Sequence, residues 1–268
     1  FRCATSVMLG GRDAAAKARR TGEAIFERTR RMFRERNLGD YRETRIETFG
    51  AEEMYGAQTR AGAAREIVLK VSARHDQKEA LDLYSLEIAQ AALGAAPGIS
   101  VFQPGRARPQ PVIRLFSFLI DKAAVPVEVD VEGESRPSEL ATDGGFDPAS
   151  LPDQTPALPE SDPEDPVTVP LIALAYGRSG DKGNHANIGL VARDPEFLPW
   201  INRAVTEAAV AEYFEHYLEG NVVRYQLPGI HGLNFMLLDA LGGGGIASLR
   251  TDPQGKAYAQ MLLDLPVS

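Results

Sequence analysis

A stretch of fourteen residues between two apolar runs carries most of the polar chemistry of this chain. Residues 176–189 read Tyr-Gly-Arg-Ser-Gly-Asp-Lys-Gly-Asn-His-Ala-Asn-Ile-Gly. Glycines allow positive φ and the close approach of a ligand. Successive N–H groups of such a turn, reinforced by Arg178 and Lys182, can hold an anion. The alternative is a β-hairpin loop whose polar side chains satisfy their own backbone.

The residue types within this stretch suggest a different role for each kind of polar side chain. The two cations would hold an anionic group, Asp181 would fix one of them, and the two carboxamides would orient a carbonyl or carboxylate, an arrangement that stabilises an enolate or oxyanion. The alternative is a purely structural role, in which Asp181 and Arg178 form an ion pair that stabilises the loop. The predicted anion-binding residues of the stretch are Arg178, Ser179, Lys182, Asn184 and Asn187.

A second glycine-rich run is a candidate for the same site. Its residues are Gly242, Gly243, Gly244 and Gly245, and consecutive N–H groups of such a run can surround a phosphate. A flexible connection is the alternative. The run lacks the lysine and hydroxyl of a nucleotide P-loop, so we exclude that motif. Because an anion needs donors from more than one segment, we expect this run to lie beside residues 178–187.

Two histidines on glycine-flanked segments, His185 and His231, are candidate general bases, with Asp181 as the third catalytic candidate. For His231 the alternative is a turn residue whose ring covers the core. Ser179, Asp181 and His185 hold the ingredients of a hydrolase triad, but all three come from one short segment, whereas triads draw on separate elements. The spacing of the four histidines and the single cysteine indicates no metal site, and no cofactor motif is evident.

The order of these motifs resembles the AtuA-like domain that closes the acyclic terpene utilisation proteins. Arg178–Asn184 and Asn187–Gly189 match its signature, and the match continues to the C-terminal end of the chain. The continuing motifs are Leu227-Pro228-Gly229, Asn234-Phe235, Gly242–Gly245, Ser248-Leu249 and Asp252–Lys256. The first half resembles, more weakly, the later part of the larger domain that precedes it in this family.

The resemblance implies a place in bacterial catabolism of terpenoid or branched acids processed as coenzyme A thioesters, without a settled reaction. One hypothesis is an enzyme or enzyme subunit that acts on a carboxylate or acyl-CoA, through hydration (a lyase or hydratase type) or a related enolate-type step. A second is a non-catalytic assembly partner of an acyl-CoA carboxylase or hydratase. A third is an anion-binding regulatory module, which rests on fold analogy.

Composition favours a cytoplasmic globular protein. The 268 residues are 44% hydrophobic and contain one cysteine, Cys3, which excludes an internal disulfide. No apolar run reaches the roughly 20 residues of a membrane span, and no secretory signal is evident. The chain starts at Phe1 without an initiator methionine. We expect a homo-oligomer or a companion chain that carries the missing first part of the larger domain.

Charge locates a boundary. From Asp130 to Val169 eleven acidic side chains face one base, Arg136, and prolines recur. Such composition opposes folding, which predicts an acidic proline-rich linker at 132–169, between domains at 1–131 and 170–268; an acidic docking arm is the alternative. The arginine-rich segment near residues 19–36 also carries glutamates at helical spacing, so we expect a solvated helix face or a subunit contact rather than nucleic-acid binding.

Periodicity predicts a mixed-sheet α/β module followed by a smaller ferredoxin-like αβ sandwich, the latter also implied by the resemblance. In the first module we expect helices at 13–38 (capped by Asp13) and 78–93, and strands at 44–49, 66–73, 112–120 and 125–131. In the second we expect strands at 171–175, 188–193 and 222–227, a strand or short helix at 233–241, and helices at 195–218 and 254–263.

Overall fold

The computed structural model describes residues 1–101, 105–139, 144–145, 147–150, 158 and 167–268. The chain divides into two compact units, of which one joins 1–114 with 156–268 and the other spans 115–155. The larger unit holds two modules, each with its own hydrophobic core, which we call the N-module and the C-module.

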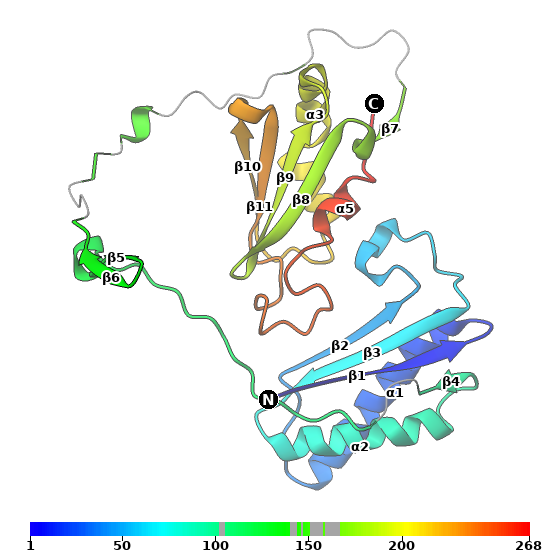
Figure 1. Cartoon of the computed structure of the whole chain (residues 1–268). Coiled ribbons are helices and arrows are strands. Elements are labelled where there is room, and N and C mark those ends of the chain that lie inside the picture. Colours follow the sequence, from blue (N-terminus) through cyan, green and yellow to red (C-terminus); the bar gives the residue numbers. More distant parts are fainter. Residues whose placement is uncertain (102–104, 140–143, 146, 151–157, 159–166) are drawn as a thin grey trace. The chain divides into compact units, whose positions relative to one another are not determined.

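The N-module is one antiparallel sheet in the order β2-β3-β1-β4, shown in Figure 1. Its strands are β1 (Arg2–Gly10), β2 (Glu43–Phe49), β3 (Glu66–Arg74) and β4 (Ile99–Ser100). Helix α1 (Ala14–Glu35) follows β1, and α2 (Lys78–Gly94) follows β3. This βαββαβ sequence with the fourth strand beside the first is the ferredoxin-like split βαβ arrangement. Sequence periodicity did not indicate it, because strand β1 was not predicted.

Both helices of the N-module cover one face of its sheet (Figure 1). Alternate strand residues such as Val7, Leu69 and Val71 pack against the buried stripe of α1, which includes Ile25 and Phe33. Both predicted helices of this module are confirmed. The predicted cap is wrong: Asp13 has left-handed φ of 56° and its side chain accepts no capping hydrogen bond.

The apolar run at 112–120 does not form the predicted strand. It has no strand partner, and the side chains of Ile113, Leu115, Phe116, Phe118, Leu119 and Ile120 are exposed. The strand predicted at 125–131 is shorter, since β5 (Glu128–Val131) pairs only with β6 (Glu134–Pro137). Short 3₁₀ turns flank this hairpin at η2 (Lys122–Ala124) and η3 (Pro148–Ser150).

Much of the predicted linker lies outside the described residues, at 140–143, 146, 151–157 and 159–166. Its described beginning contains β6, whose residues are all exposed, so this part forms a small hairpin rather than only an extended chain. The boundaries proposed at 131/132 and 169/170 stay predictions.

The C-module is a second four-stranded antiparallel sheet, in the order β10-β11-β9-β8 (Figure 1). Its strands are β8 (Ala175–Lys182), β9 (His185–Ala192), β10 (Val222–Leu227) and β11 (Gly232–Leu237). If β8 is counted last, the order of strands and helices becomes that of the N-module. The C-module is therefore a circular permutation of the same topology, with its edge strand β8 placed first in the sequence.

This topology corrects the expectation of a glycine-rich loop. Residues 175–192 form one regular hairpin whose turn contains only Gly183 and Asn184. The predicted strand at 171–175 is instead the 3₁₀ turn η4 (Leu171–Ala173), preceded by the short strand β7 (Val169–Pro170), which pairs with β12 (Pro266–Val267). The strand predicted at 222–227 is confirmed as β10.

The helices of the C-module lie on one face of its sheet and enclose a core that includes Ile188, Phe214, Phe235 and Tyr258. The single long helix predicted at 195–218 is wrong. It is η5 (Pro195–Phe197), α3 (Leu198–Ala204) and α4 (Glu207–Tyr213), because Thr206 starts a new helix by accepting a hydrogen bond from the N–H of Ala209. The last helix, α5 (Tyr258–Leu262), is shorter than predicted.

The remaining short elements are η1 (Glu53–Gln58) in the N-module and η6 (Pro228–Ile230) between β10 and β11. The 242–256 loop of the C-module bonds to the N-module sheet. Lys70 donates to the carbonyl of Leu249 over 2.8 Å and to Oγ1 of Thr251 over 2.9 Å, and the N–H of Thr251 donates to Glu47 over 3.0 Å. None of the helices among the described residues is long and apolar enough to cross a bilayer.

Candidate functional site

The face of the C-module sheet that points away from its helices carries four of the predicted polar residues, and we call it the outer face. These are Arg178, Lys182, His185 and Asn187. Because strand residues alternate, Ser179 points at α5 while Arg178, Gly180 and Lys182 point outward. The strand register places these residues in rows that run across the neighbouring strands β9, β11 and β10. Lys182 lies opposite His185, and Gly180 lies in one row with Asn187 and Met236. The row of Arg178 continues through Gly189, Asn234 and Tyr225.

Three cations border the edge of this face. Lys182 donates to Oδ1 of Asn187 over 3.2 Å, and Lys256 reaches from the 242–256 loop to within 3.7 Å of Asp181. Arg178 is exposed, and its guanidinium makes no hydrogen bond or ion pair with any residue that the structure describes. The predicted alternative of an Arg178–Asp181 staple is therefore not observed, since Asp181 pairs with Lys256 instead.

Two glycines, Gly180 and Gly189, lie on the sheet surface between these cations. Neither Gly180 nor Gly189 has positive φ, so the backbone does not require glycine at either place. A Cβ on Gly189 would meet only the carbonyl of Arg178, at 3.7 Å, and one on Gly180 would meet the mobile end of Lys256 at 3.1 Å. By contrast, a Cβ on Gly232 would lie 2.6 Å from the carbonyl of Leu190. Glycine inside a strand without such a need marks close approach by something else.

Two carboxamides complete the outer face. Nδ2 of Asn187 donates to Oδ1 of Asn234 over 3.0 Å, while Oδ1 of Asn187 accepts from Lys182. Each carboxamide oxygen thus already accepts one hydrogen bond, and N–H donors of Asn234, Asn187, Arg178 and the lysines remain for a ligand. A surface that offers donors and positive charge suits an anion or a developing oxyanion.

The predicted proximity of the hairpin turn and the glycine run is observed. Oδ1 of Asn184 accepts from the N–H of Gly243 over 2.7 Å, and its Nδ2 donates to Asp239 over 2.9 Å. A Cβ on Gly244 would lie 2.8 Å from the carbonyl of Gly183, and Gly242, Gly243 and Gly244 all have positive φ. Gly244 is therefore needed to pack this loop on the turn, and both polar atoms of the Asn184 carboxamide are bonded within the protein.

His185 lies on the outer face beside Lys182 and is 40% exposed. Its Nδ1 accepts a hydrogen bond from the N–H of Asp239 over 2.9 Å. In the neutral ring this leaves the proton on Nε2, so His185 presents another donor rather than the base that we predicted.

His231 does not join this group. It precedes β11 with φ of 51°, and its carbonyl accepts from the N–H of Ala192 at the far end of β9 from His185. Strand β9 has eight residues, so seven steps of about 3.3 Å, roughly 23 Å in all, separate its two ends. The two histidines therefore cannot act on one substrate atom.

Ser179 is also removed from the outer face. It is buried, donates to the carbonyl of Lys256 over 3.2 Å and accepts from the N–H of Ala259 over 2.9 Å, at the start of α5. With Ser179 against α5 and Asp181 on Lys256, the ingredients of a hydrolase triad do not meet. The structure gives Ser179 a packing role in place of the predicted anion contact.

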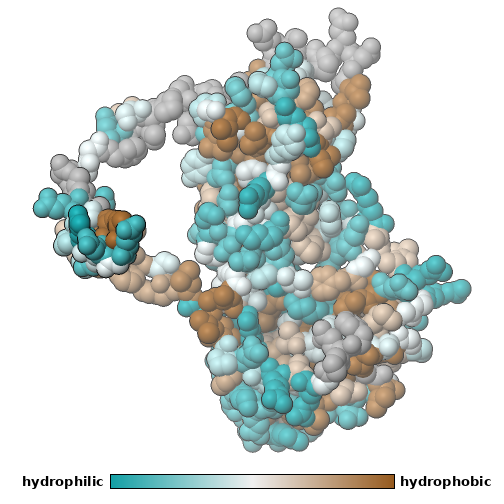
Figure 2. Space-filling model, in the orientation of Figure 1, coloured by the Kyte–Doolittle hydropathy of each residue, from teal (hydrophilic) through white to brown (hydrophobic). Residues whose placement is uncertain are grey.

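Apolar side chains border the donors on the same face. Tyr225 is the last residue in the row of Arg178, and Val223 is the last residue in the row of Asn187. Both side chains are exposed. Tyr176 is exposed too, and the centre of its ring lies 3.9 Å from the guanidinium carbon of Arg193. In Figure 2 hydrophobic residues gather at the upper end of the β10–β11 pair, while hydrophilic residues cover the lower part of this sheet. A ligand with an anionic end and an apolar body would match this division.

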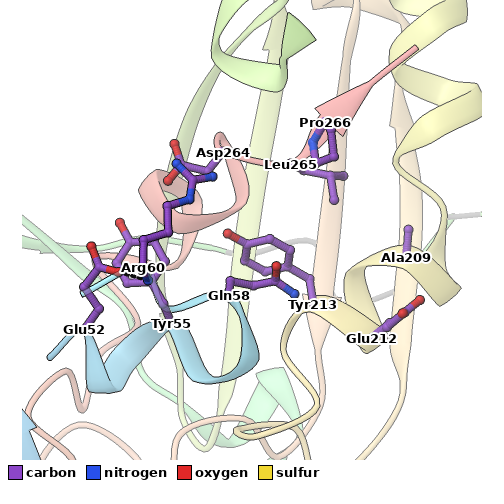
Figure 3. A pocket seen from close by; sticks show the side chains of 10 residues that line it. All are labelled: Glu52, Tyr55, Gln58, Arg60, Ala209, Glu212, Tyr213, Asp264, Leu265 and Pro266. Atoms are coloured by element: carbon purple, nitrogen blue, oxygen red, sulfur yellow. Dashed lines mark hydrogen bonds between the residues drawn. The ribbon is translucent and has the colours of Figure 1, made fainter. Parts of the chain in front are cut away.

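A separate cavity of about 410 Å³ is less suited to an anion (Figure 3). Its lining comes from residues 52–60, from α4 and from the C-terminal stretch 264–266. Three carboxylates, Glu52, Glu212 and Asp264, accompany one cation, Arg60. Burial, and then the charge of Asp264, raises the pKa of Tyr213 to about 12, and its hydroxyl donates to the carbonyl of Met261. The charge balance opposes a carboxylate ligand.

Sequence reasoning missed Lys256, Asn234, Gly180 and Gly189 as site residues. The alternation of Arg178, Gly180 and Lys182 was available as a strand signal, but the glycine content favoured a loop. Nothing local in the sequence places Lys256 beside Asp181. Among the described residues no cluster of three or more histidine, cysteine or acidic side chains could hold a metal ion.

Comparison with known families gives two matches. Residues 1–131 match the family model described as acyclic terpene utilisation family protein AtuA, and residues 169–268 match the model described as AtuA ferredoxin-like domain. Searches of curated proteins and of solved structures gave no match. The predicted fold class, a mixed α/β module followed by a ferredoxin-like domain, is confirmed.

Proposed function

Because the chain belongs to the acyclic terpene utilisation family AtuA, we propose that its ferredoxin-like domain binds the anionic end of a terpenoid or branched acyl substrate. The ligand is a carboxylate or a coenzyme A thioester, held on the outer face with its apolar body along the Tyr225 side. The observation that carries the proposal is Arg178, whose exposed guanidinium has no hydrogen-bond or ion-pair partner among the described residues. It lies beside a strand glycine, Gly189, that neither φ nor packing requires.

The donors of the outer face fit an enolate-type step of an enzyme or enzyme subunit. When a thioester carbonyl gains charge in the transition state, N–H donors that already point at the oxygen stabilise it without reorganising. Arg178, Asn234 and the Nε2–H of His185 are such donors. Asp181 points to the α5 side of the sheet and pairs with Lys256, and Asp239 accepts a hydrogen bond from Asn184. We therefore assign the general base to a group outside the outer face.

The test is Arg178→Lys, which keeps the charge but removes the planar bidentate donor pair. Affinity for a panel of branched carboxylates and their coenzyme A thioesters, measured by calorimetry, should fall by roughly 1–3 kcal/mol. The melting temperature should not change, because the Arg178 side chain has no partner within the part of the chain that the structure describes. Arg31→Lys, at an exposed position of α1, is the matched control. Unchanged affinity in Arg178→Lys, or no binding by the unmodified chain, would reject the proposal.

A second candidate, a non-catalytic assembly partner, draws on the exposed apolar run at 113–120. Leu119 is fully exposed, and Phe116 is 83% exposed. Contiguous apolar surface of this kind usually contacts another chain, a second copy or a companion polypeptide. Sedimentation of the unmodified chain and of a Phe116→Ser, Leu119→Ser variant tests this. Association that the double variant abolishes supports the role, and a monomeric unmodified chain contradicts it.

A further inference from the structure

A second cavity, of about 630 Å³, opens between the N-module sheet and the 242–256 loop of the C-module. Its floor includes Ala4 of β1 and Ser72 of β3, which are direct partners in the strand register. The segment 107–110 forms one wall and the loop residues Gly245–Pro253 form another. This volume lies within the roughly 300–1,000 Å³ of small-molecule sites.

The lining of this cavity is strongly basic. Its described residues include Arg2, Lys70, Arg108 and Arg250 and no carboxylate. The neighbouring Arg74 lies in the same positive electrostatic potential. Burial is the largest cause that lowers the pKa of its guanidinium, and the positive charges of Arg114 and Arg2 lower it further, whereas the charge of Glu43 raises it. A concave surface lined by one sign of charge concentrates ligands of the other sign.

Two of these four cations, Lys70 and Arg250, already use their side-chain donors in hydrogen bonds within the protein. Lys70 donates to Glu47, to the carbonyl of Leu249 and to Thr251, which uses its three protons. Arg250 donates to the carbonyls of Tyr217 and Ala240 and to Glu219. These two hold the 242–256 loop in place as the wall of the cavity.

The other two cations retain donors for a ligand. Arg2 uses Nη1 on the carbonyl of Ile246 over 2.8 Å, and its remaining guanidinium nitrogens form no hydrogen bond or ion pair with described residues. The side chain of Arg108 makes neither contact within the part of the chain that the structure describes. The backbone that carries it is fixed, since the neighbouring Ala107 carbonyl accepts from Ser85 and Gln110 pairs with Arg2.

Ser72 supplies an independent indication of a ligand. Only 1% of this residue is exposed, it lines the cavity, and its hydroxyl has no hydrogen-bond partner among the described residues. Leaving a buried hydroxyl unsatisfied costs about 1–3 kcal/mol, so a bound molecule that accepts its hydrogen bond would remove this cost. Its neighbour on the floor is the small residue Ala4, which leaves room above the hydroxyl.

From this arrangement we propose that the cavity binds the phosphate or diphosphate group of a small molecule, with Arg108 and Arg2 gripping the phosphoryl oxygens and Ser72 donating to one of them. Two guanidinium forks and a hydroxyl match the several acceptor oxygens and the multiple charge of a phosphoryl group better than those of a single carboxylate. The volume accommodates more than an isolated phosphate. The inference is independent of the proposed function, because it uses no residue of the outer face.

Calorimetric titration of the full chain with inorganic pyrophosphate and with ADP tests the proposal. Arg108→Ala should weaken pyrophosphate binding about tenfold or more, the usual scale for a charge-assisted contact. Arg106→Ala removes the same charge from an exposed position of the same segment outside the cavity, and it should change binding less than twofold. Tighter binding of ADP than of pyrophosphate identifies a nucleotide, and equal binding identifies the diphosphate alone as the recognised group.

Ser72→Ala separates binding from folding. The change removes a buried unsatisfied hydroxyl, so the melting temperature without ligand should be unchanged or higher, while pyrophosphate affinity should fall several-fold. Arg178→Lys should leave pyrophosphate binding intact, which distinguishes this cavity from the outer face. The proposal is overturned if neither probe binds at millimolar concentration, or if Arg106→Ala weakens binding as much as Arg108→Ala does.

Discussion

Asn187 donates from Nδ2 to Oδ1 of Asn234 over 3.0 Å and so joins the middle of two neighbouring strands on the outer face. The bond fixes both carboxamides, because Lys182 simultaneously bonds Oδ1 of Asn187. The N–H groups that remain are oriented before any ligand arrives. Such preorganisation is what makes donors effective toward a developing negative charge.

Two asparagines of the same hairpin should differ in their effect on ligand affinity when replaced by alanine. Each change removes two hydrogen bonds, to Lys182 and Asn234 for Asn187 and to Gly243 and Asp239 for Asn184, so each should lower the free energy of unfolding by roughly 1–2 kcal/mol. Only Asn187→Ala removes an outer-face donor, so it alone should weaken binding of acyl ligands, by about tenfold. Urea titration and calorimetry on both variants measure the two quantities. Weaker binding by Asn184→Ala with unchanged binding by Asn187→Ala would show that Asn184 contacts the ligand.

Gly189→Ala should preserve the fold and block the site. Its new Cβ meets only a carbonyl at ordinary contact distance, and alanine favours folding by roughly 0.5–1 kcal/mol over glycine inside a strand. A ligand that approaches the strand between Arg178 and Asn234 would meet the added methyl, so its affinity should fall. Gly232→Ala is the contrasting variant, because its Cβ would clash with the carbonyl of Leu190 and should destabilise the sheet. Undiminished binding by a stable Gly189→Ala protein would place the ligand elsewhere.

The sequence predicted those features that depend on local periodicity or on a family signature. The spacing of Ala14, Ala18, Ile25 and Phe33 gave helix α1, and the apolar alternation of 222–227 gave β10. Periodicity alone failed where a helix breaks without losing its apolar stripe, as at Thr206. It also failed at 112–120, since an apolar run forms a strand only when a neighbouring strand offers it hydrogen bonds.

The site was predictable in its residue types but not in its pairing. Arg178, Lys182 and Asn187 lie on the outer face as candidate donors, whereas Ser179 points at α5 and His231 lies at the other end of β9. Asp181 forms its ion pair with Lys256 because the 242–256 loop packs on the hairpin turn. These two segments are about sixty residues apart in the sequence. Long-range contacts of this kind leave no local signal in a single sequence.

Cys3 should react only when the chain unfolds. The thiol is buried at 2% exposure, and burial, followed by the charge of Asp82, raises its pKa to about 11. At pH 8 it is therefore protonated and inaccessible, and a thiolate is the reactive form. A disulfide reagent such as DTNB should modify less than a tenth of the protein in the native state within the time that fully labels it in 6 M guanidinium. Rapid native labelling would mean that β1 opens at its N-terminal end.

Acid should weaken the contact between the two modules through Glu47. Burial alone would raise the pKa of this carboxyl, but the hydrogen bond and charge of Lys70, the N–H of Thr251 and the charge of Arg45 outweigh it and hold the pKa below the usual 4.5. A carboxyl with a lowered folded-state pKa contributes stability above its unfolded value, and that contribution is lost as the pH falls through the folded value. Stability should therefore decline below about pH 4.5.

Glu47→Gln isolates this contribution. At pH 7 the variant should lose roughly 3 kcal/mol of unfolding free energy, because Lys70 keeps a charge without its buried partner. Below pH 4.5 its stability should fall less steeply than that of the unmodified chain, since the titrating group is gone. Glu66→Gln, at an exposed position of the neighbouring strand, should follow the unmodified chain at both pH values. Urea titrations from pH 3 to 7 provide the comparison, and equal slopes in all three proteins would exclude Glu47 as the acid-sensitive group.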